Sequence, residues 1–293
     1  MKKGTNLQAE ELQFDTIVEP KNKWFDLNLK ELWKYKDLML LFVKRNFISQ
    51  YKQTVLGPAW AVIQPLLTTV VFTLVFGGIA KLAPGGVNGF IYYLCGTIFW
   101  QYFASCLTMV SHTFTGNANI FGKVYFPRMV LPVSTVTTNL ISLAIQFSFF
   151  LVAWVIFLLL PGSQIQPGWQ IALLPLAVAE LALLALGCGI IISALTTKYR
   201  DLAMLVSFGV QLWMYASPVA YPASMFAGSK VEILYWCNPA CPMIEMIRFA
   251  FLGPAAAQFR PLMWGISWVT TFVILFVGIL LFSRVEKTFM DTV

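Results

Sequence analysis

The chain has 293 residues, of which 58% are apolar and only 11% are charged, and its mean hydropathy is +0.73. Because a soluble globular domain carries about a quarter charged residues, this composition excludes that class and indicates a polytopic membrane protein. The net charge of +7 does not indicate nucleic-acid binding, because the positive residues follow the membrane topology predicted below. We therefore expect membrane lipids around this chain, and no nucleic acid.

Residues 1–53 are predicted to form a cytoplasmic arm that ends in an amphipathic helix. The first twenty residues lack the apolar core of a signal peptide. Between positions 29 and 53 apolar residues recur at spacings of three and four, and basic residues fill many of the other positions. This pattern is typical of a helix in the membrane interface, with its lysines near anionic headgroups. The alternative is a core-facing helix in a small soluble domain. This alternative is disfavoured because the segment lies directly before a membrane span.

Residues 54–293 are predicted to form one transmembrane domain with six spans. The first span, 59–79, follows Gly57-Pro58, carries no charge and has the length of about 20 residues that crosses the hydrocarbon core. Pro58 suits the first turn of a helix, whereas Pro65 should kink it. The other spans are predicted at 91–110, 131–160, 171–195, 202–221 and 262–282. The third is longer than a bilayer requires and should tilt or protrude.

Residues 222–261, between the fifth and sixth spans, are predicted to form a re-entrant helical hairpin. Their apolar stretches 233–236 and 243–252 are separated by Asn238-Pro239 and Pro242, and each is too short to cross. The expected fold is therefore an all-α polytopic membrane protein with six transmembrane helices, an N-terminal interface helix and this hairpin.

The orientation follows from the lysines and arginines. With the N-terminus inside, sixteen of the twenty lie on the inner side, and Lys81, Lys230, Arg248 and Arg260 lie outside. Positive residues concentrate in cytoplasmic loops. We therefore expect both termini in the cytoplasm and the hairpin on the outer face.

Few residues of this chain could carry chemistry. Its one candidate phosphate loop, 116–124, fails because its glycine spacing is one residue too long and Val124 replaces the Ser or Thr that would hold magnesium. His112 is the single histidine, so no histidine-based metal cluster is expected. We expect no catalytic residue, metal or cofactor in this chain. Glu180 is the one acid inside a span; a hydrogen bond to a neighbouring helix is favoured over a proton-coupled role, which usually needs more than one buried titrating group.

Two inner loops and a set of aromatic residues provide further indications. The loop 113–132 is rich in aromatic residues, which suggests docking into a partner's groove; a loop that skims the membrane is the alternative. The short loop 196–201 could serve the same contact. Aromatic residues crowd the first, second and fifth spans, as would suit a glycan channel. An interfacial belt of Trp and Tyr residues is the alternative to a channel, and composition alone favours the belt.

Several segments, in the right order, resemble the ABC-2 type permeases that export polysaccharides. They are 51–65 (YKQTVLGPAWAVIQP), 123–132 (KVYFPRMVLP), 193–201 (SALTTKYRD), 211–222 (QLWMYASPVAYP), and Asn238-Pro239 with Glu245, Arg248 and Gly253. The similarity extends over nearly the whole chain from about Trp24, and lipid-linked O-antigen permeases look nearest. The family pattern has Asn followed by an aliphatic residue where this chain has Thr196-Thr197. The contacts of this loop are therefore assigned less specifically than the family itself.

The resemblance implies a homodimer in the bacterial inner membrane, with two copies of a separate ATP-binding subunit that holds ATP and magnesium. The substrate would be an undecaprenyl-diphosphate-linked polysaccharide that moves from cytoplasm to periplasm. Permeases for teichoic acid, capsule, or a small drug or lipid are the alternatives. A membrane enzyme of glycan assembly is a third class, and it would need an acid, histidine or metal constellation that the inner loops lack.

The resemblance also implies four groups of site residues. ATPase coupling would involve Asn119, Phe121, Lys123, Tyr125, Phe126, Arg128, Tyr199, Arg200 and Asp201. The substrate channel would be lined by Trp60, Phe72, Phe76, Trp100, Trp213, Tyr215 and Tyr221. The entrance for the diphosphate would use Lys44, Arg45 and Lys52. The site residues of the outer hairpin would be Asn238, Glu245 and Arg248.

Overall fold

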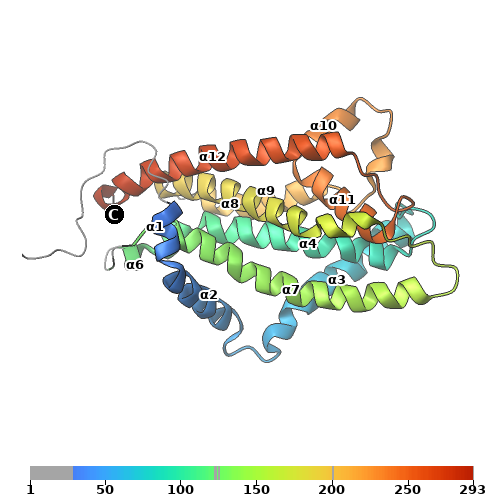
Figure 1. Ribbon diagram of the computed structural model, residues 1–293, viewed down its shortest axis with the longest axis horizontal. Helices are drawn as coiled ribbons and strands as arrows, with labels where there is room; N and C mark the ends of the chain where they lie inside the picture. The colour runs from blue at the N-terminus through green and yellow to red at the C-terminus, as the bar shows by residue number, and fades with distance from the viewer. Residues whose placement is uncertain (1–28, 122–123, 125, 200, 293) are drawn as a thin grey trace, which may run out of the picture.

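The computed structural model describes residues 29–121, 124, 126–199 and 201–292, and every regular element in these ranges is a helix (Figure 1). Five helical segments are long and apolar enough to cross a membrane: Gly57–Ile79, Gly89–Ser111, Val130–Leu159, Trp169–Lys198 and Pro261–Val285. A shorter apolar helix, Leu202–Tyr215, lies between the fourth and the fifth of them. The prediction of an all-α polytopic membrane fold is confirmed.

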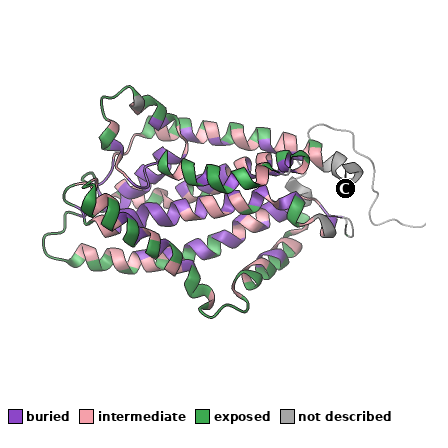
Figure 2. Cartoon of the chain, turned by 180° about the vertical axis from the view of Figure 1, so that it is seen from behind, coloured by how far each residue is buried: buried purple, intermediate pink, exposed green. Residues whose placement is uncertain are grey.

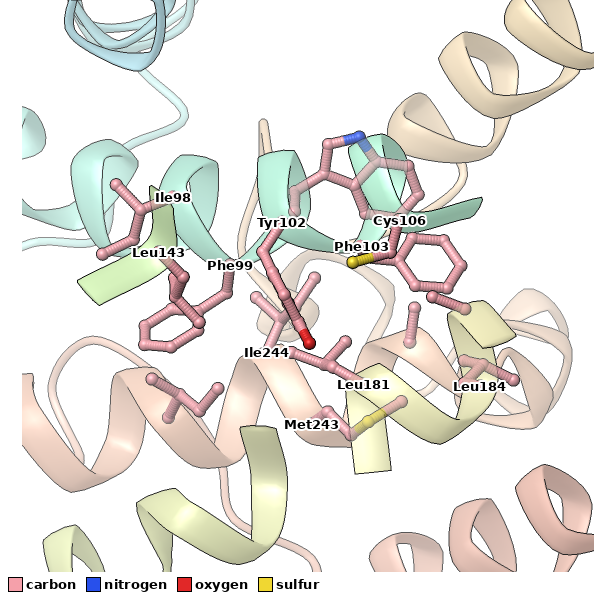
Figure 3. Close-up of a cluster of buried hydrophobic side chains, with 14 of the residues drawn as sticks. Ile98, Phe99, Tyr102, Phe103, Cys106, Leu143, Leu181, Leu184, Met243 and Ile244 are labelled. Carbon is pink, nitrogen blue, oxygen red and sulfur yellow. The ribbon is translucent and has the colours of Figure 1, made fainter. Parts of the chain in front are cut away.

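Helix α4 (Gly89–Ser111) forms the centre of the bundle. In its most apolar stretch 78% of the residues are buried, whereas the share is 17–33% in the other four candidate spans. Figure 2 shows the buried residues of this helix along the length of the bundle. Helices α3 (Trp60–Phe72), α7 (Val130–Leu159), α8 (Leu174–Lys198) and α9 (Leu202–Tyr215) pack on it. Figure 3 shows Phe99, Tyr102 and Phe103 of α4 among side chains of α7, α8 and α11 (Ala240–Leu252).

The first span begins where the sequence predicts, because Gly57 and Pro58 open a turn of 3-10 helix, Gly57–Ala59, that continues into α3. Pro65 lies inside α3, and its carbonyl accepts a hydrogen bond from the Thr69 hydroxyl at 2.7 Å. The Thr73 hydroxyl bonds the Thr69 carbonyl at 2.8 Å, where the span changes to a π-helix over Thr73–Ile79. Both hydroxyl groups are thus hydrogen-bonded to backbone carbonyls of the same span and need no water.

The predicted helix 29–53 and the predicted fifth span, 202–221, differ from the structure. The first is divided at Tyr35 into α1 (Leu29–Lys34) and α2 (Lys36–Tyr51), and α2 packs on α7. The second ends at Tyr215, because Pro218 and Pro222 supply no backbone donor and the chain turns there. At 1.5 Å per residue, the 14 residues of α9 span about 21 Å, less than the hydrocarbon core.

The segment predicted as a re-entrant hairpin contains two short helices, α10 (Val231–Cys237) and α11, and its place relative to the membrane stays a prediction. The break between them falls at Asn238-Pro239, as expected from the sequence. Helix α11 is buried except at Phe249, and Gly253 ends it with φ 90°. The last helix, α12 (Pro261–Thr292), returns along α8, and two short helices, α5 (Thr113–Gly116) and α6 (Ala118–Phe121), link α4 to α7.

Glycines allow α8 and α12 to approach closely. A Cβ atom on Gly187 would lie 2.9 Å from backbone atoms of Leu275, and one on Gly278 would lie 2.8 Å from the Gly187 carbonyl oxygen. Small residues are common at helix contacts in membranes, because packing drives association where water is absent. The α8–α12 contact therefore depends on these two positions.

Substitution Gly187→Ala should destabilise the protein by about 1–3 kcal/mol, because the new methyl group forces two helix backbones apart. Thermal unfolding of the detergent-solubilised protein measures the effect. Gly265→Ala is the matched control on α12, since a Cβ there meets no atom within 4 Å. Equal unfolding midpoints for the two variants would contradict this account of the contact.

Candidate functional site

A polar cavity of about 270 Å³, here called the amide pocket, lies where α2, α3, α4 and α7 meet. It is lined by Gln50, Tyr51, Thr54, Trp60, Ala61, Gln64, Gln101, Tyr102, Ser105, Asn139, Ser142, Leu143 and Gln146. None of these side chains is charged, and most carry an amide or a hydroxyl group. Such groups are costly in a membrane unless they are hydrogen-bonded or reach a polar cavity.

Helical spacing places these polar groups on common faces. On α7, Asn139, Ser142 and Gln146 follow one another at steps of three and four residues, and on α4 Gln101 and Ser105 are four residues apart. These residues were not among the predicted site residues. The signal was present in the sequence, as amides recurring at helical spacing within otherwise apolar spans.

Most polar groups of the pocket have a partner. The Tyr51 and Ser142 hydroxyls lie 3.2 Å apart, and the Asn139 amide donates to the Thr135 carbonyl at 3.0 Å. Two buried groups of the lining have no hydrogen-bond partner in the described chain: the Tyr102 hydroxyl and the Oε1 atom of Gln146, a residue that is 6% exposed.

A second cavity of about 160 Å³, here called the Arg45 pocket, adjoins the first and shares Gln50 with it. It is lined by Arg45, Asn46, Gln50, Met109, Asn117, Leu131, Thr135 and Thr138. Arg45 lies over the Phe42 ring at 4.7 Å and donates to the Asn46 amide oxygen at 3.0 Å. Of the three residues predicted for a diphosphate entrance, Arg45 alone lines this cavity, whereas Lys44 and Lys52 are exposed elsewhere on the surface.

The aromatic residues predicted to line a channel fall in several places. Trp60 is 46% exposed and lines the amide pocket. Phe72 packs against Phe76, and Trp100 packs against Trp213. Phe72 and Trp100 are buried within the single chain, so they serve as core residues and do not reach its surface.

The remaining two predicted channel residues lie at the end of α9. Tyr215 is 45% exposed, and the Tyr221 hydroxyl donates to its carbonyl. Within one described chain the aromatic residues therefore do not form a continuous lining. Five of the seven, Trp60, Phe76, Trp213, Tyr215 and Tyr221, are exposed or partly exposed, and their channel role stays a prediction.

The hairpin residue Asn238 joins α9 to α11. Its amide oxygen accepts hydrogen bonds from the Trp213 indole at 2.9 Å and from the Ala240 backbone at 3.1 Å. Its amide nitrogen donates to Ser217 at 2.9 Å. Two residues that the sequence placed in separate groups, Trp213 and Asn238, are thus in direct contact.

Arg248 is fully buried and holds α11 against α4 and the turn after α9. Its guanidinium donates to the Tyr92 hydroxyl at 2.8 Å and to the carbonyls of Pro218 and Val219. Glu245, one turn earlier, lies 3.8 Å away and also accepts a hydrogen bond from the Gln258 backbone. Tyr92 belongs to this cluster and was missed by the sequence prediction.

Gly96 completes this cluster, and the sequence prediction missed it as well. A Cβ atom at Gly96 would lie 2.2 Å from a terminal nitrogen of Arg248. Glycine at this position therefore makes room for the guanidinium on the buried face of α4. A lone glycine in an apolar helix offers no sequence signal for a partner so far along the chain.

Glu180 forms the hydrogen bonds to a neighbouring helix that the sequence prediction favoured. Its carboxyl oxygens accept bonds from the Trp264 indole and the Ser267 hydroxyl of α12, each at 2.6 Å. Ser267 also lies 2.8 Å from the Pro239 carbonyl oxygen. Glu180 therefore links α8 to α12 beside the break in the hairpin, and the described residues contain no group of three metal-ligand side chains.

The predicted ATPase-coupling residues lie at one end of the bundle, near α5, α6 and the end of α8 (Figure 1). Phe121 and Phe126 are buried, so they shape this region and do not extend from it. Arg128 lies over the Phe121 ring at 5.2 Å, and Tyr199 and Asp201 are exposed. Lys123, Tyr125 and Arg200 lie outside the described residues, as does the side chain of Asn119.

Comparison with known proteins identifies the class. Residues 37–252 match the ABC-2 type transporter family, so the chain belongs to this family of membrane permeases. It is 26% identical over 255 residues to an O-antigen export system permease protein RfbA of Klebsiella pneumoniae, covering 87% of this chain and 94% of the relative. A protein of the same name from Myxococcus xanthus is 26% identical, covering 80% and 88%.

These matches confirm the resemblance noted in the sequence. Members of this family are transport subunits and not enzymes, and they work with an ATP-binding partner subunit. The relatives are permeases for O-antigen export, as their names state. The chain is therefore a membrane-spanning permease subunit.

Substitution Arg248→Met should destabilise the protein by roughly 3–5 kcal/mol, because it leaves Glu245 and two carbonyls buried without their cation. Thermal unfolding in detergent measures the loss. Arg260→Met is the control, because Arg260 forms a partly exposed pair with Glu232 and the loss of such a surface pair costs little. If Arg248→Met unfolds at the same temperature as Arg260→Met, the buried cluster does not hold the hairpin.

The pair formed by Glu232 and Arg260 should make stability depend on pH. Hydrogen bonds from the Gly228 backbone and from Arg260 hold the pKa of Glu232 below its usual value. A lowered pKa in the folded state means that this contribution is present at neutral pH and is lost as pH falls through the carboxyl range near 4. The difference in unfolding midpoint between wild type and Glu232→Gln should therefore be largest at neutral pH and shrink below about pH 4. A constant difference across this range would contradict the assignment.

Proposed function

We propose that this chain is the permease subunit of an ATP-driven exporter of an undecaprenyl-diphosphate-linked, O-antigen-type polysaccharide. It works in the bacterial inner membrane as a homodimer with two ATP-binding subunits, which hold ATP and magnesium. The observation that carries the proposal is the similarity, over 94% of their length, to two permeases named for O-antigen export.

The pockets are chemically suited to such a substrate. The Arg45 pocket provides a cation beside uncharged polar groups, as a lipid diphosphate requires. The amide pocket beside it provides amides, hydroxyls and the Trp60 indole. A permease for an apolar drug would have little use for an uncharged cavity with this many hydrogen-bonding groups.

The arrangement of the ends supports export from a cytoplasmic face. Figure 1 shows α1, α6 and the C-terminal end of α12 at one end of the bundle, and α10 toward the other. Lys34 at the end of α1 and Arg284 in the last part of α12 are among the described residues that the positive-inside rule assigns to the cytoplasm. In the proposed topology both termini are cytoplasmic and the hairpin faces the periplasm.

The two inner loops adjoin one another, which supports their joint role as the contact for the ATP-binding subunit. The Phe114 backbone donates to the Ser193 hydroxyl at 3.3 Å, and the Thr196 hydroxyl donates to the Ser111 carbonyl at 3.3 Å. Phe114 also stacks on Phe282 of α12 at 4.6 Å. A movement imposed on α5 and α6 is thereby passed to α8 and α12.

Deletion of the gene tests the proposal. Intact cells are stained for surface polysaccharide, and the lipid-linked glycan pool is extracted. Loss of surface glycan with accumulation of the lipid-linked form is the expected result. Normal surface glycan would overturn the proposal in favour of a drug or lipid permease, and loss without accumulation would indicate a defect in assembly.

The substitutions Trp60→Ala and Tyr215→Ala should each lower export roughly two- to tenfold, because one aromatic contact contributes about 0.5–1.5 kcal/mol. Surface polysaccharide per cell is the measurement, and copurification of the ATP-binding subunit shows that assembly is intact. Trp169→Ala is the control, since this tryptophan is exposed on a different element and lines neither pocket. Unchanged surface glycan in both test variants would exclude an aromatic role in transport.

A further inference from the structure

The amide pocket contains a buried acceptor without a partner in the described chain. Gln146 lies on α7, only 6% of it is exposed, and its Oε1 atom receives no hydrogen bond. A buried acceptor left in this state costs about 1–3 kcal/mol, so native proteins rarely keep one without a reason. A ligand that donates a hydrogen bond at this position would remove the cost.

The other groups around Gln146 define the chemistry of that ligand. Gln64, Gln101 and Asn139 each present an amide, which can both donate and accept, and Ser105 and Ser142 present hydroxyls. The absence of any lysine, arginine, aspartate or glutamate from the lining excludes an ion as the preferred occupant. A neutral molecule with several hydroxyl groups satisfies such a set, because each hydroxyl also donates and accepts.

Trp60 supplies an apolar surface at the edge of the same pocket. Its side chain is 46% exposed, so the indole is open to a ligand. A sugar ring presents C–H groups on its faces and hydroxyls around its rim, which matches an indole surface beside a ring of amides. The volume of the amide pocket, about 270 Å³, lies just below the 300–1,000 Å³ range of drug-sized pockets. A pocket of this size suits one sugar ring and is too small for several linked sugars.

The neighbouring Arg45 pocket indicates how the ligand would be oriented, with its charged group toward Arg45. The two cavities share Gln50, so a cationic site adjoins an uncharged, hydrogen-bonding one. In a lipid-linked glycan the diphosphate is joined directly to the first sugar. We infer that the amide pocket binds the sugar attached to the diphosphate of the glycolipid, while Arg45 contacts the diphosphate; this inference rests on the proposed function.

Binding to the purified permease, in complex with its ATP-binding subunit in detergent, tests this inference. The probes are undecaprenyl-diphosphate-N-acetylglucosamine, undecaprenyl diphosphate without a sugar, and phosphatidylglycerol, whose headgroup also carries hydroxyls. Native mass spectrometry measures the dissociation constant of each. We expect the sugar-bearing lipid to bind about tenfold more tightly than the sugar-free one, as two or three net hydrogen bonds allow.

The substitutions Gln146→Leu and Gln64→Leu should each reduce this preference to about threefold or less, and leave binding of the sugar-free lipid unchanged. Gln146→Leu should retain or raise the unfolding temperature, because it removes an unsatisfied buried acceptor. Gln64 is exposed, so its replacement tests the pocket without disturbing the core. Gln170→Leu is the matched control, the same change on the 3-10 helix Trp169–Leu173, away from both pockets.

The outcomes separate failure of this inference from failure of the proposed function. Equal affinity of wild type for the lipids with and without sugar, or an unchanged preference in both pocket variants, would overturn the sugar site. Phosphatidylglycerol binding that is lost in the same variants would also overturn it and assign the pocket to a membrane lipid. The gene-deletion experiment decides separately whether the chain exports a polysaccharide at all.

Discussion

The lack of water in the hydrocarbon core governs this structure, because every polar group placed there needs a partner within the protein. The described chain buries Arg248, Glu180, Glu245, Asn139 and Gln146 in its helices, and Arg248 and Glu180 are hydrogen-bonded to other helices. Glu180 links α8 to α12, and Asn238 joins the end of α9 to the start of α11. These polar contacts select one arrangement among the many that apolar helix packing alone would allow.

Arg248 shows how this constraint permits an interrupted structure at membrane depth. The turn after α9 leaves the carbonyls of Pro218 and Val219 without helical partners, and the guanidinium of Arg248 satisfies both. Gly96 leaves room for that guanidinium on the face of α4. Arg248 therefore joins the buried helix α11 to the turn after the short helix α9, in addition to the contacts of Asn238.

The amide pocket is one of the places in the described chain where this constraint is not met by the chain itself. Its polar side chains occupy regular positions on α4 and α7, as buried core residues would, yet Gln146 keeps an acceptor unused. The same residue types therefore complete their hydrogen bonds within the protein at Asn238 and leave an acceptor unpaired at Gln146.

The sequence by itself determined five of the six predicted spans and the break between two short helices at Asn238-Pro239, because long apolar runs and prolines act locally on the backbone. Only the tertiary structure decided which side chains meet. Tyr92 and Arg248 are 156 residues apart in the chain, and the burial of Trp100 depends on which face of α4 the other helices cover. In an apolar helix every face has similar hydropathy, so periodicity does not show which face is buried, and the partners of its polar residues come from helices distant in sequence.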